Sequence, residues 1–287
     1  MQSVKDCFTL NNGVTIPCIG YGTWKTPDGD DTIKAVTDAI ACGYRHIDTA
    51  QLYGNEGGVG KGIIASGVPR EELFITTKLK NDAQGYDSTL KAFEESLKLL
   101  KLDYLDMFLI HWPIPVKYKE NWQEVSRETW KAMERLYEEK LVRAIGLSNF
   151  LPHHIKNLAV TANVAPCIDQ LEIHPYYPQQ EAADYCRKEK IQVQAWSPLG
   201  HGSILEDETL KKIGEKYGKS IAQVSLRWEL QQDILPVSKS LNPGRMKQNT
   251  EVFDFSLTKE EVELITNLGN DRRMGSHPDM VTFSKTG

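Results

Sequence analysis

The sequence predicts an α/β protein, a (β/α)8 TIM barrel whose bottom is closed by an N-terminal β-hairpin. Eight short apolar runs recur along the 287 residues, and most are followed by segments with the three- and four-residue periodicity of amphipathic helices. Strands that alternate with helices form right-handed crossovers and a parallel sheet. Eight such units in a chain of this length favour a closed barrel over a doubly wound sheet. No Pro/Gly/Ser-rich linker divides the chain, so we expect residues 1–287 to form one domain.

The hairpin is predicted first along the chain, from residues 7–10 and 14–18, because Asn11-Asn12-Gly13 lies between them and Asn-Gly favours a tight turn with positive φ. The expected barrel strands are the apolar runs 18–22, 44–47, 73–77, 105–110, 142–147, 167–171, 191–195 and 234–237. The expected helices are 31–41, 88–100, 127–140, 180–188, 208–217, 221–231 and 257–268. The longest irregular stretch, 113–123, carries Trp122 and is interpreted as a lid or substrate-facing loop.

Composition and charge exclude several classes of protein. With 40% hydrophobic and 25% charged residues, the chain has the composition of a globular protein rather than a disordered or collagen-like one. Its 34 Lys and Arg residues against 39 Asp and Glu residues give a net charge of −5, which does not indicate a nucleic acid or an anionic membrane as partner.

Cysteine spacing and hydropathy indicate the compartment. No two of the five cysteines are close enough for a CxxC motif, and an odd number of scattered cysteines is typical of free thiols in a reducing compartment. No apolar run approaches the ~18 residues of a membrane span, and the N-terminus lacks the apolar core of a signal peptide. We therefore expect a cytoplasmic protein, and a monomer, because no oligomerisation signal is evident.

Polar and aromatic residues end successive apolar runs, where a barrel places its active site. These residues are Asp48, Lys78, His111, Ser148, Asn149, Gln170, Trp196, Ser197, Lys239 and Ser240. Individually they have structural explanations: Asp48 as a helix cap, His111 as a core histidine, Lys78 as a side chain reaching solvent. Their convergence on one end of a barrel favours a functional site.

Asp48, Lys78 and His111, together with the nearby Tyr53, could transfer a proton to a substrate oxygen. Tyr53 lies five residues beyond Asp48, and a free phenol with a pKa near ~10 is a poor acid at neutral pH. The ammonium of Lys78 would stabilise the phenolate and lower that pKa, while Asp48 would keep Lys78 protonated. His111 would hydrogen-bond the substrate oxygen. This set suits carbonyl reduction, which also needs a hydride donor.

The hydride donor must be a cofactor, because no side chain supplies a hydride. The GxGxxG fingerprint is absent, and 214–220 is one residue too short for a phosphate loop, so a helix-to-helix turn is the preferred interpretation there. Trp196 offers a ring for a nicotinamide to stack on, and Ser148, Asn149 and Gln170 offer hydrogen bonds to its carboxamide. Lys239, Ser240 and Arg245 form a basic cluster suited to a 2′-phosphate, which favours NADPH over NADH. A solvated basic loop remains the alternative for Arg245.

Three motifs resemble the aldo-keto reductase family and together run along most of the chain. The first comprises residues 43–50 with Tyr53, Glu56 and Gly60. The second comprises Met133 and residues 143–150. The third comprises residues 237–240 with Arg245, Gln248 and Asn249.

The resemblance implies a hairpin-plugged barrel that reduces aldehydes and ketones with NADPH, and its length suggests a short microbial-type member. It implies a catalytic tetrad of Asp48, Tyr53, Lys78 and His111, with Tyr53 as general acid. The cofactor-binding residues that it implies are Ser148, Asn149, Gln170, Trp196, Ser197, Leu199, Lys239, Ser240, Arg245, Gln248 and Asn249.

Three residues depart from the family pattern. Ser238 stands where a proline is usual before Lys239. Gln248 replaces a commoner glutamate, and either a glutamine or a glutamate at this position could accept from the adenine amino group. Lys80 stands where relatives often place a tryptophan, which would make the wall of the substrate pocket more polar. Trp24 and Trp112 are the aromatic wall candidates, with ordinary packing as their alternative role.

Two other functions are alternatives. One is an NADPH-binding regulatory or interaction subunit with little turnover. The other, a metal-dependent hydrolase, is disfavoured because Asp48 and His111 lack further histidine partners at strand ends, so we expect no metal. The tail, 269–287, is short and is expected to leave the barrel mouth open to a range of small carbonyl substrates.

Overall fold

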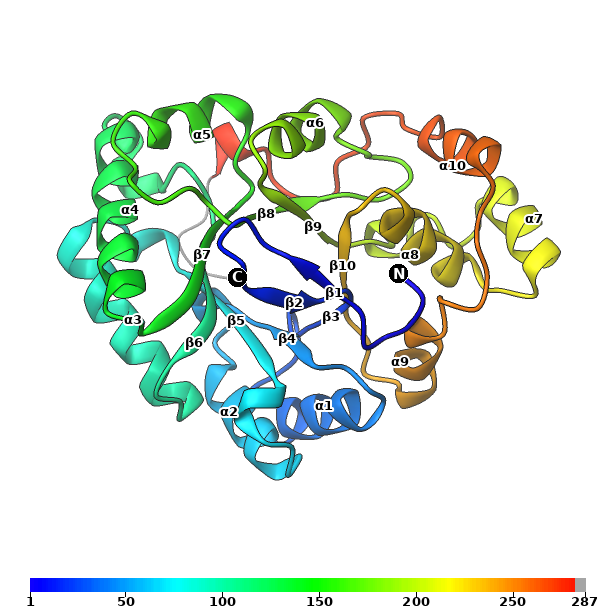
Figure 1. The fold of residues 1–287 in the computed structure, drawn as a ribbon, viewed down its shortest axis with the longest axis horizontal. Coiled ribbons are helices and arrows are strands. Elements are labelled where there is room, and N and C mark those ends of the chain that lie inside the picture. The colour runs from blue at the N-terminus through cyan, green and yellow to red at the C-terminus, as the bar shows by residue number, and fades with distance from the viewer. Residues whose placement is uncertain (282–287) are drawn as a thin grey trace.

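A closed barrel of eight parallel strands forms the centre of the protein (Figure 1). A computed structural model describes residues 1–281. The strands pair in the order β10-β3-β4-β5-β6-β7-β8-β9, so each pairs with its neighbours along the chain and the last closes on the first. They are β3 (Gly20–Gly22), β4 (His46–Asp48), β5 (Phe74–Leu79), β6 (Leu105–Ile110), β7 (Val142–Ser148), β8 (Ile168–Glu172), β9 (Gln192–Trp196) and β10 (Leu235–Ser238). All eight predicted runs overlap these strands, which confirms the predicted barrel.

Helices surround the barrel (Figure 1). They are α1 (Asp30–Ala41), α2 (Glu56–Ala65), α3 (Tyr86–Leu100), α4 (Trp122–Glu138), α5 (Pro152–Ala159), α6 (Gln180–Lys188), α7 (Glu208–Tyr217), α8 (Ile221–Gln231), α9 (Pro243–Thr250) and α10 (Lys259–Thr266). The bounds of α6, α7 and α8 agree with the prediction. α4 begins at Trp122, five residues before the predicted start, so Trp122 lies on a helix rather than in the irregular segment.

Helix α2 was not predicted because four of its ten residues are glycine, the poorest helix former after proline. Its glycines are required by close packing. A Cβ atom at Gly60 would overlap the backbone of Leu100, and one at Gly62 would come within 2.8 Å of Val36. The low propensity of α2 is therefore offset by close contact with α1 and α3.

The N-terminal hairpin closes the bottom of the barrel, as predicted. β1 (Cys7–Thr9) pairs antiparallel with β2 (Thr15–Pro17), and both cross the centre of the ring of strands in Figure 1. Phe8 and Ile16 point inward and belong to one buried cluster with Met107 and Leu109 of β6. This apolar plug leaves the opposite end, where the strands terminate, as the end available for a site.

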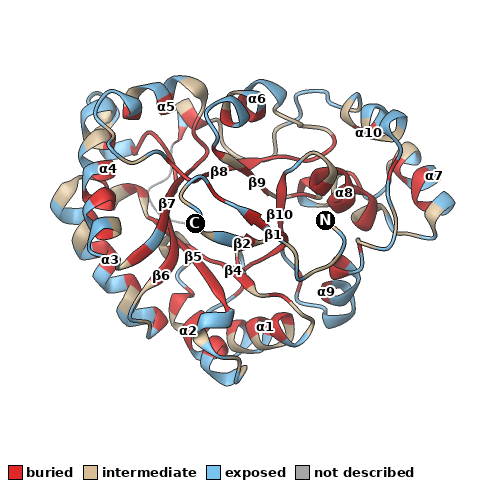
Figure 2. Ribbon diagram, viewed as in Figure 1, coloured by how far each residue is buried: buried red, intermediate tan, exposed pale blue. Residues whose placement is uncertain are grey.

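The core follows the alternation of buried and exposed faces (Figure 2). The strands and the inward faces of the helices are buried, while the outward faces of the helices are exposed. Phe93 of α3 and Phe108 of β6 meet edge to face, with ring centroids 5.3 Å apart.

None of the helices among residues 1–281 has the length and apolarity needed to cross a membrane. All five cysteines are free thiols.

Glu229 of α8 is a buried carboxyl group that the fold must accommodate. Its residue exposure is 0%, and no described residue hydrogen-bonds either carboxylate oxygen. Burial raises the pKa of Glu229 well above its ordinary value. The folded protein thus retains a proton that the unfolded chain releases, so stability falls as the pH rises above the ordinary glutamate pKa.

We predict that Glu229→Gln, which cannot ionise, is more stable than wild type by about 1–3 kcal/mol near pH 8, with a smaller difference near pH 5. Urea unfolding followed by circular dichroism at both pH values measures this difference. Equal unfolding free energies for the two proteins at both pH values would contradict a buried, partnerless Glu229.

Candidate active site

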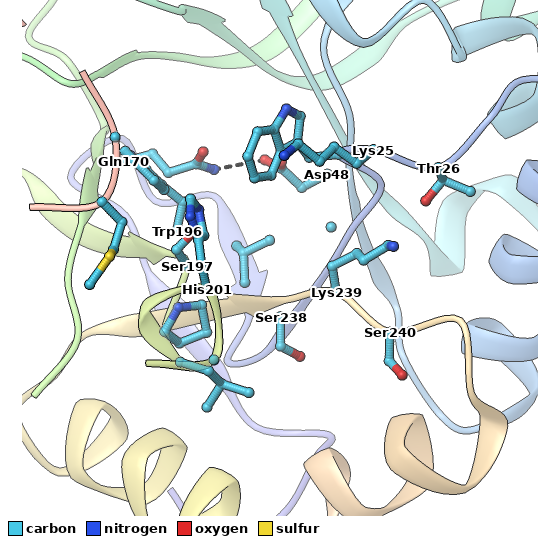
Figure 3. A pocket seen from close by; sticks show the side chains of 18 of the residues that line it. Lys25, Thr26, Asp48, Gln170, Trp196, Ser197, His201, Ser238, Lys239 and Ser240 are labelled. Atoms are coloured by element: carbon cyan, nitrogen blue, oxygen red, sulfur yellow. Dashed lines mark hydrogen bonds between the residues drawn. The ribbon is translucent and has the colours of Figure 1, made fainter. Parts of the chain in front are cut away.

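The carboxyl ends of the barrel strands surround one large cavity of about 1620 Å³ (Figure 3). Because all eight strands are parallel, the residues that end them converge on the same rim. All but two of the residues predicted as catalytic, cofactor-binding or pocket-lining line this cavity. Those that line it are Trp24, Asp48, Tyr53, His111, Trp112, Ser148, Asn149, Gln170, Trp196, Ser197, Leu199, Lys239, Ser240, Arg245, Gln248 and Asn249. The exceptions are Lys78 and Lys80.

Lys78 lies beneath the cavity and forms an ion pair with Asp48. Its side chain is 0% exposed, and its Nζ lies 2.5 Å from Asp48 Oδ1. Nζ also donates to the carbonyl oxygen of Thr49 at 3.0 Å and lies 3.5 Å from the Tyr53 hydroxyl. Gln170 Nε2 donates to the other Asp48 oxygen at 2.7 Å, as Figure 3 shows. The lysine and the carboxylate are therefore fixed from several directions directly below Tyr53.

Lys80 is the sequence prediction that the geometry does not support. It is not among the described residues that line the cavity. Its backbone N–H donates to Gln51 Oε1 at 2.9 Å, and its charge acts on the pKa of Glu56. Only Leu79, the last residue of β5, separates Lys80 from Lys78, and the short 3-10 turn Asn81–Ala83 follows directly. The idea that Lys80 makes the pocket wall more polar is thus corrected.

The ionisable groups of the site differ in charge. Burial alone would lower the pKa of Lys78, but Asp48 and Tyr53 outweigh it, so the pKa is raised and the ammonium persists. Burial raises the pKa of the Tyr53 phenol above its ordinary value, while Lys78 acts in the opposite direction. The sequence predicted the effect of Lys78 but not the larger effect of burial. At neutral pH Tyr53 therefore keeps its proton beside a cation.

His111 is buried and neutral. Burial, reinforced by the charge of Lys78, lowers the pKa of His111 well below its ordinary value. Its ring meets that of Tyr53 edge to face with centroids 5.6 Å apart, and it stacks on Trp112 at 6.4 Å. Nδ1 has no hydrogen-bond partner among residues 1–281. Since a buried N–H without an acceptor is costly, we assign the hydrogen to Nε2.

Asn149 is the centre of a hydrogen-bond network at the end of β7. Its Nδ2 donates to the carbonyl oxygen of His111 at 3.0 Å and to Ser148 Oγ at 3.1 Å. Its Oδ1 accepts from Trp196 Nε1 at 2.9 Å. Both amide hydrogens of Asn149 are thus used within the protein, and its oxygen orients the indole of Trp196.

Gln170 is placed differently from Asn149. Its two amide hydrogens go to Asp48 and to Gln194 Oε1, and no described residue donates to its own Oε1. The Oε1 atom of Gln170 is therefore available to accept a hydrogen bond from a carboxamide, the role that the sequence predicted for this residue.

A cluster of cations lies at one rim of the cavity. Lys239 and Arg245 were predicted there, and the structure adds Lys25, whose Nζ lies 4.4 Å from the ring centroid of Trp24. Burial, followed by the charge of Lys25, lowers the pKa of Lys239, which places the two lysines within electrostatic range. The position of Lys25 directly after Trp24, three residues beyond the first barrel strand, is the sequence signal that could have indicated it.

Ser238, which stands in place of a proline, is part of the same rim (Figure 3). Its Oγ accepts from Asn249 Nδ2 at 3.3 Å and lies 3.4 Å from the Tyr44 hydroxyl. The serine thus connects the end of β10 to helix α9, on which Arg245 and Gln248 also lie.

Further residues that were not predicted also line the cavity. One is His201, in the same loop after β9 as the predicted Ser197 and Leu199, and its ring lies 5.2 Å from Trp24 and 6.4 Å from Trp196. Others are Met274, Gly275 and Ser276 of the C-terminal tail. The expectation that the short tail leaves the mouth open is therefore wrong on the side of Trp196.

The comparisons with known proteins agree with this geometry. Residues 18–270 match the model of the aldo/keto reductase family. The chain is 48% identical to the 9,11-endoperoxide prostaglandin H2 reductase of Trypanosoma cruzi, over 97% of each chain. It is also 48% identical to the glyoxal reductase of Bacillus subtilis, over 98% of this chain and 99% of the relative.

Solved structures show the same similarity. An aldo/keto reductase from Brucella melitensis superposes with a TM-score of 0.87 at 46% identity, covering 92% of this chain and 99% of the other. An aldo-keto reductase from Bombyx mori, solved in complex with NADP, superposes with a TM-score of 0.88 at 39% identity over 97% of each chain. With its barrel, its strand-end residues and these full-length matches, the chain belongs to the aldo/keto reductase family.

Proposed function

We propose that the chain catalyses the NADPH-dependent reduction of small aldehydes and ketones to alcohols, with Tyr53 as the proton donor. The observation that carries the proposal is the protonated Tyr53 hydroxyl at the cavity, 3.5 Å from the Nζ of a buried, charged Lys78. A neutral phenol beside a fixed cation suits the protonation of an oxygen that becomes negatively charged.

The cavity fits a dinucleotide together with a small substrate. Its volume of about 1620 Å³ exceeds the ~300–1,000 Å³ typical of pockets for one small ligand. Trp196 would stack on the nicotinamide and Gln170 Oε1 would accept from its carboxamide. The adenosine side would be held by Lys239, Ser240, Arg245, Gln248 and Asn249, with Ser197 and Leu199 between the two ends. When bound, NADPH supplies the hydride that reduces the carbonyl carbon.

The protein groups handle the oxygen. His111, neutral with its hydrogen on Nε2, donates a hydrogen bond to the carbonyl oxygen and orients it. Tyr53 transfers its proton to that oxygen as charge develops there. Lys78 stabilises the resulting phenolate, and Asp48 keeps Lys78 charged despite its burial.

The substrate class follows from the walls of the cavity and from the relatives. Trp24, Trp112 and Trp196 give aromatic walls, and Lys80 is not among the cavity-lining residues. The relatives at 48% identity include a glyoxal reductase, which supports small reactive carbonyls such as methylglyoxal as substrates. A cytoplasmic monomer remains our expectation.

We predict that Tyr53→Phe lowers kcat/KM for methylglyoxal about 10²–10⁴-fold, because the general acid is removed while the ring is kept. The measurement is the loss of NADPH absorbance. Tyr185→Phe, on the outer helix α6, is the matched control and should retain wild-type activity.

Two results would contradict this assignment. Equal rates for wild type and Tyr53→Phe would remove Tyr53 from the chemistry. Tight NADPH binding by wild type with no turnover across a panel of aldehydes and ketones would favour the regulatory-subunit alternative.

We predict that Arg245→Ala raises the NADPH dissociation constant by about tenfold or more and leaves that of NADH nearly unchanged, because only NADPH carries a 2′-phosphate for the guanidinium. Titration of protein fluorescence with each cofactor measures both constants. Lys212→Ala, on the outer helix α7, is a cation-removal control. Similar losses for both cofactors would show that Arg245 does not recognise the 2′-phosphate.

The pKa directions predict the pH dependence of reduction. The pKa of Tyr53 is raised, so its proton is present up to alkaline pH, and the pKa of His111 is lowered, so it stays neutral in the acid range. We expect kcat/KM to be flat from about pH 6 to pH 9 and to fall only at higher pH. A titration near pH 6.5 that disappears in His111→Asn would contradict a neutral His111.

A further inference from the structure

The C-terminal tail forms a wall of the cavity and is fastened there. After α10, the N–H of Asn270 donates to the carbonyl oxygen of Tyr176 at 3.1 Å. The chain then brings Met274, Gly275 and Ser276 to the cavity beside Trp196. We call these three residues the tail segment. Beyond it lies the short 3-10 turn Pro278–Met280.

Glu172 holds the tail segment from inside the barrel. It is the last residue of β8, and its side chain is 0% exposed. One carboxylate oxygen accepts the N–H of Met274 at 2.5 Å, and the other accepts the N–H of Gly275 at 3.0 Å. His174 Nε2 lies 3.2 Å from the first oxygen. Burial alone would raise the pKa of Glu172, but these contacts outweigh it and lower the pKa, so the group is a carboxylate at neutral pH.

The fastening brings the tail backbone against Trp196. A Cβ atom at Gly275 would overlap the indole of Trp196 and would lie 3.2 Å from Glu172 Oε2. Position 275 thus has no room for a side chain while the two hydrogen bonds to Glu172 persist. The indole is held by Asn149 at Nε1 and is covered by Gly275 at its six-membered ring.

A second fastening follows the tail segment. Asp279 Oδ1 lies 2.9 Å from His153 Nε2 and 2.8 Å from His154 Nε2, both at the start of α5. This grouping resembles a metal site. However, His154 Nδ1 accepts the N–H of Leu151 at 3.0 Å, so its hydrogen is on Nε2, which then has no lone pair for a metal. The cluster therefore fixes the tail to α5 rather than forming a three-ligand metal centre.

We propose that Glu172 is a positioning residue for the carbonyl pocket: it holds the tail segment against Trp196 and so fixes the wall that faces the substrate. Glu172 is not among the described residues that line the cavity, so it acts through the tail. The inference rests on the proposed function, because the affected quantity is the affinity for a carbonyl substrate.

The test compares Glu172→Gln with Glu229→Gln, the same substitution at a buried carboxyl group that does not contact the tail. Glutamine at position 172 loses the charge and turns an NH2 group toward one of the two tail N–H groups. We expect KM for methylglyoxal to rise about tenfold in Glu172→Gln, with kcat and the NADPH dissociation constant within about twofold of wild type. Glu229→Gln should match wild type in all three.

A second variant and a measurement without turnover complete the experiment. Gly275→Ala displaces the segment from the opposite side, so it should raise KM similarly, and the double variant should show no further multiplication. Hydrogen–deuterium exchange read by mass spectrometry should be about tenfold faster in the peptide that contains 274–276 in Glu172→Gln, but not in Glu229→Gln.

Three outcomes would overturn the proposal. Faster exchange of the tail peptide with unchanged KM would show that the segment does not shape the pocket. A joint loss of kcat, NADPH affinity and melting temperature would make Glu172 a general structural residue. If wild type reduces no carbonyl, the proposed function fails and the role of Glu172 in the carbonyl pocket fails with it, whereas the exchange data still decide whether Glu172 fastens the tail.

Discussion

The buried ion pair between Lys78 and Asp48 is the interaction on which the site depends. A charged lysine with no exposed surface is tolerated only because Asp48 lies 2.5 Å away and the carbonyl oxygen of Thr49 accepts a further hydrogen bond. The pair in turn sets the electrostatics above it. Its lysine opposes the effect of burial on the pKa of Tyr53, while Lys78 and burial together lower the pKa of His111. The same cation therefore acts to lower both pKa values, against the effect of burial at Tyr53 and together with it at His111.

The barrel makes this arrangement possible by bringing strand ends together. Asp48, Lys78 and Gln170 come from β4, β5 and β8, which are far apart in sequence, yet Gln170 and Lys78 contact the same carboxylate. The hairpin fills the other end of the barrel with Phe8 and Ile16, so the polar groups are confined to one end. Because one end of the barrel is filled with apolar side chains, the charged groups at the other end lie in a partly dehydrated site, where their electrostatic interactions are stronger than in water.

The features that could be predicted from the sequence are those that follow from hydrophobic periodicity and from the positions of strand ends. The barrel strands and the rim residues followed from the positions of the apolar runs, because side chains at the ends of parallel strands must meet. Lys80 was misplaced because sequence distance from a strand end does not determine how the loop turns. The tail segment was missed because its contacts are made by backbone N–H groups of Met274 and Gly275, which no side-chain pattern reveals. Helix α2 was missed because its glycines serve packing rather than helix propensity.

Position 149, at the centre of the site, can accept very few residue types. Its backbone has φ 64, a left-handed conformation that asparagine, aspartate and glycine adopt with least strain. Its amide must also donate twice and accept once. Aspartate lacks the donors, glycine lacks the amide, and glutamine would have to accept an unfavourable backbone conformation. Among the residue types compared, only asparagine satisfies both requirements, so we expect this position to tolerate almost no substitution in a library selected for function.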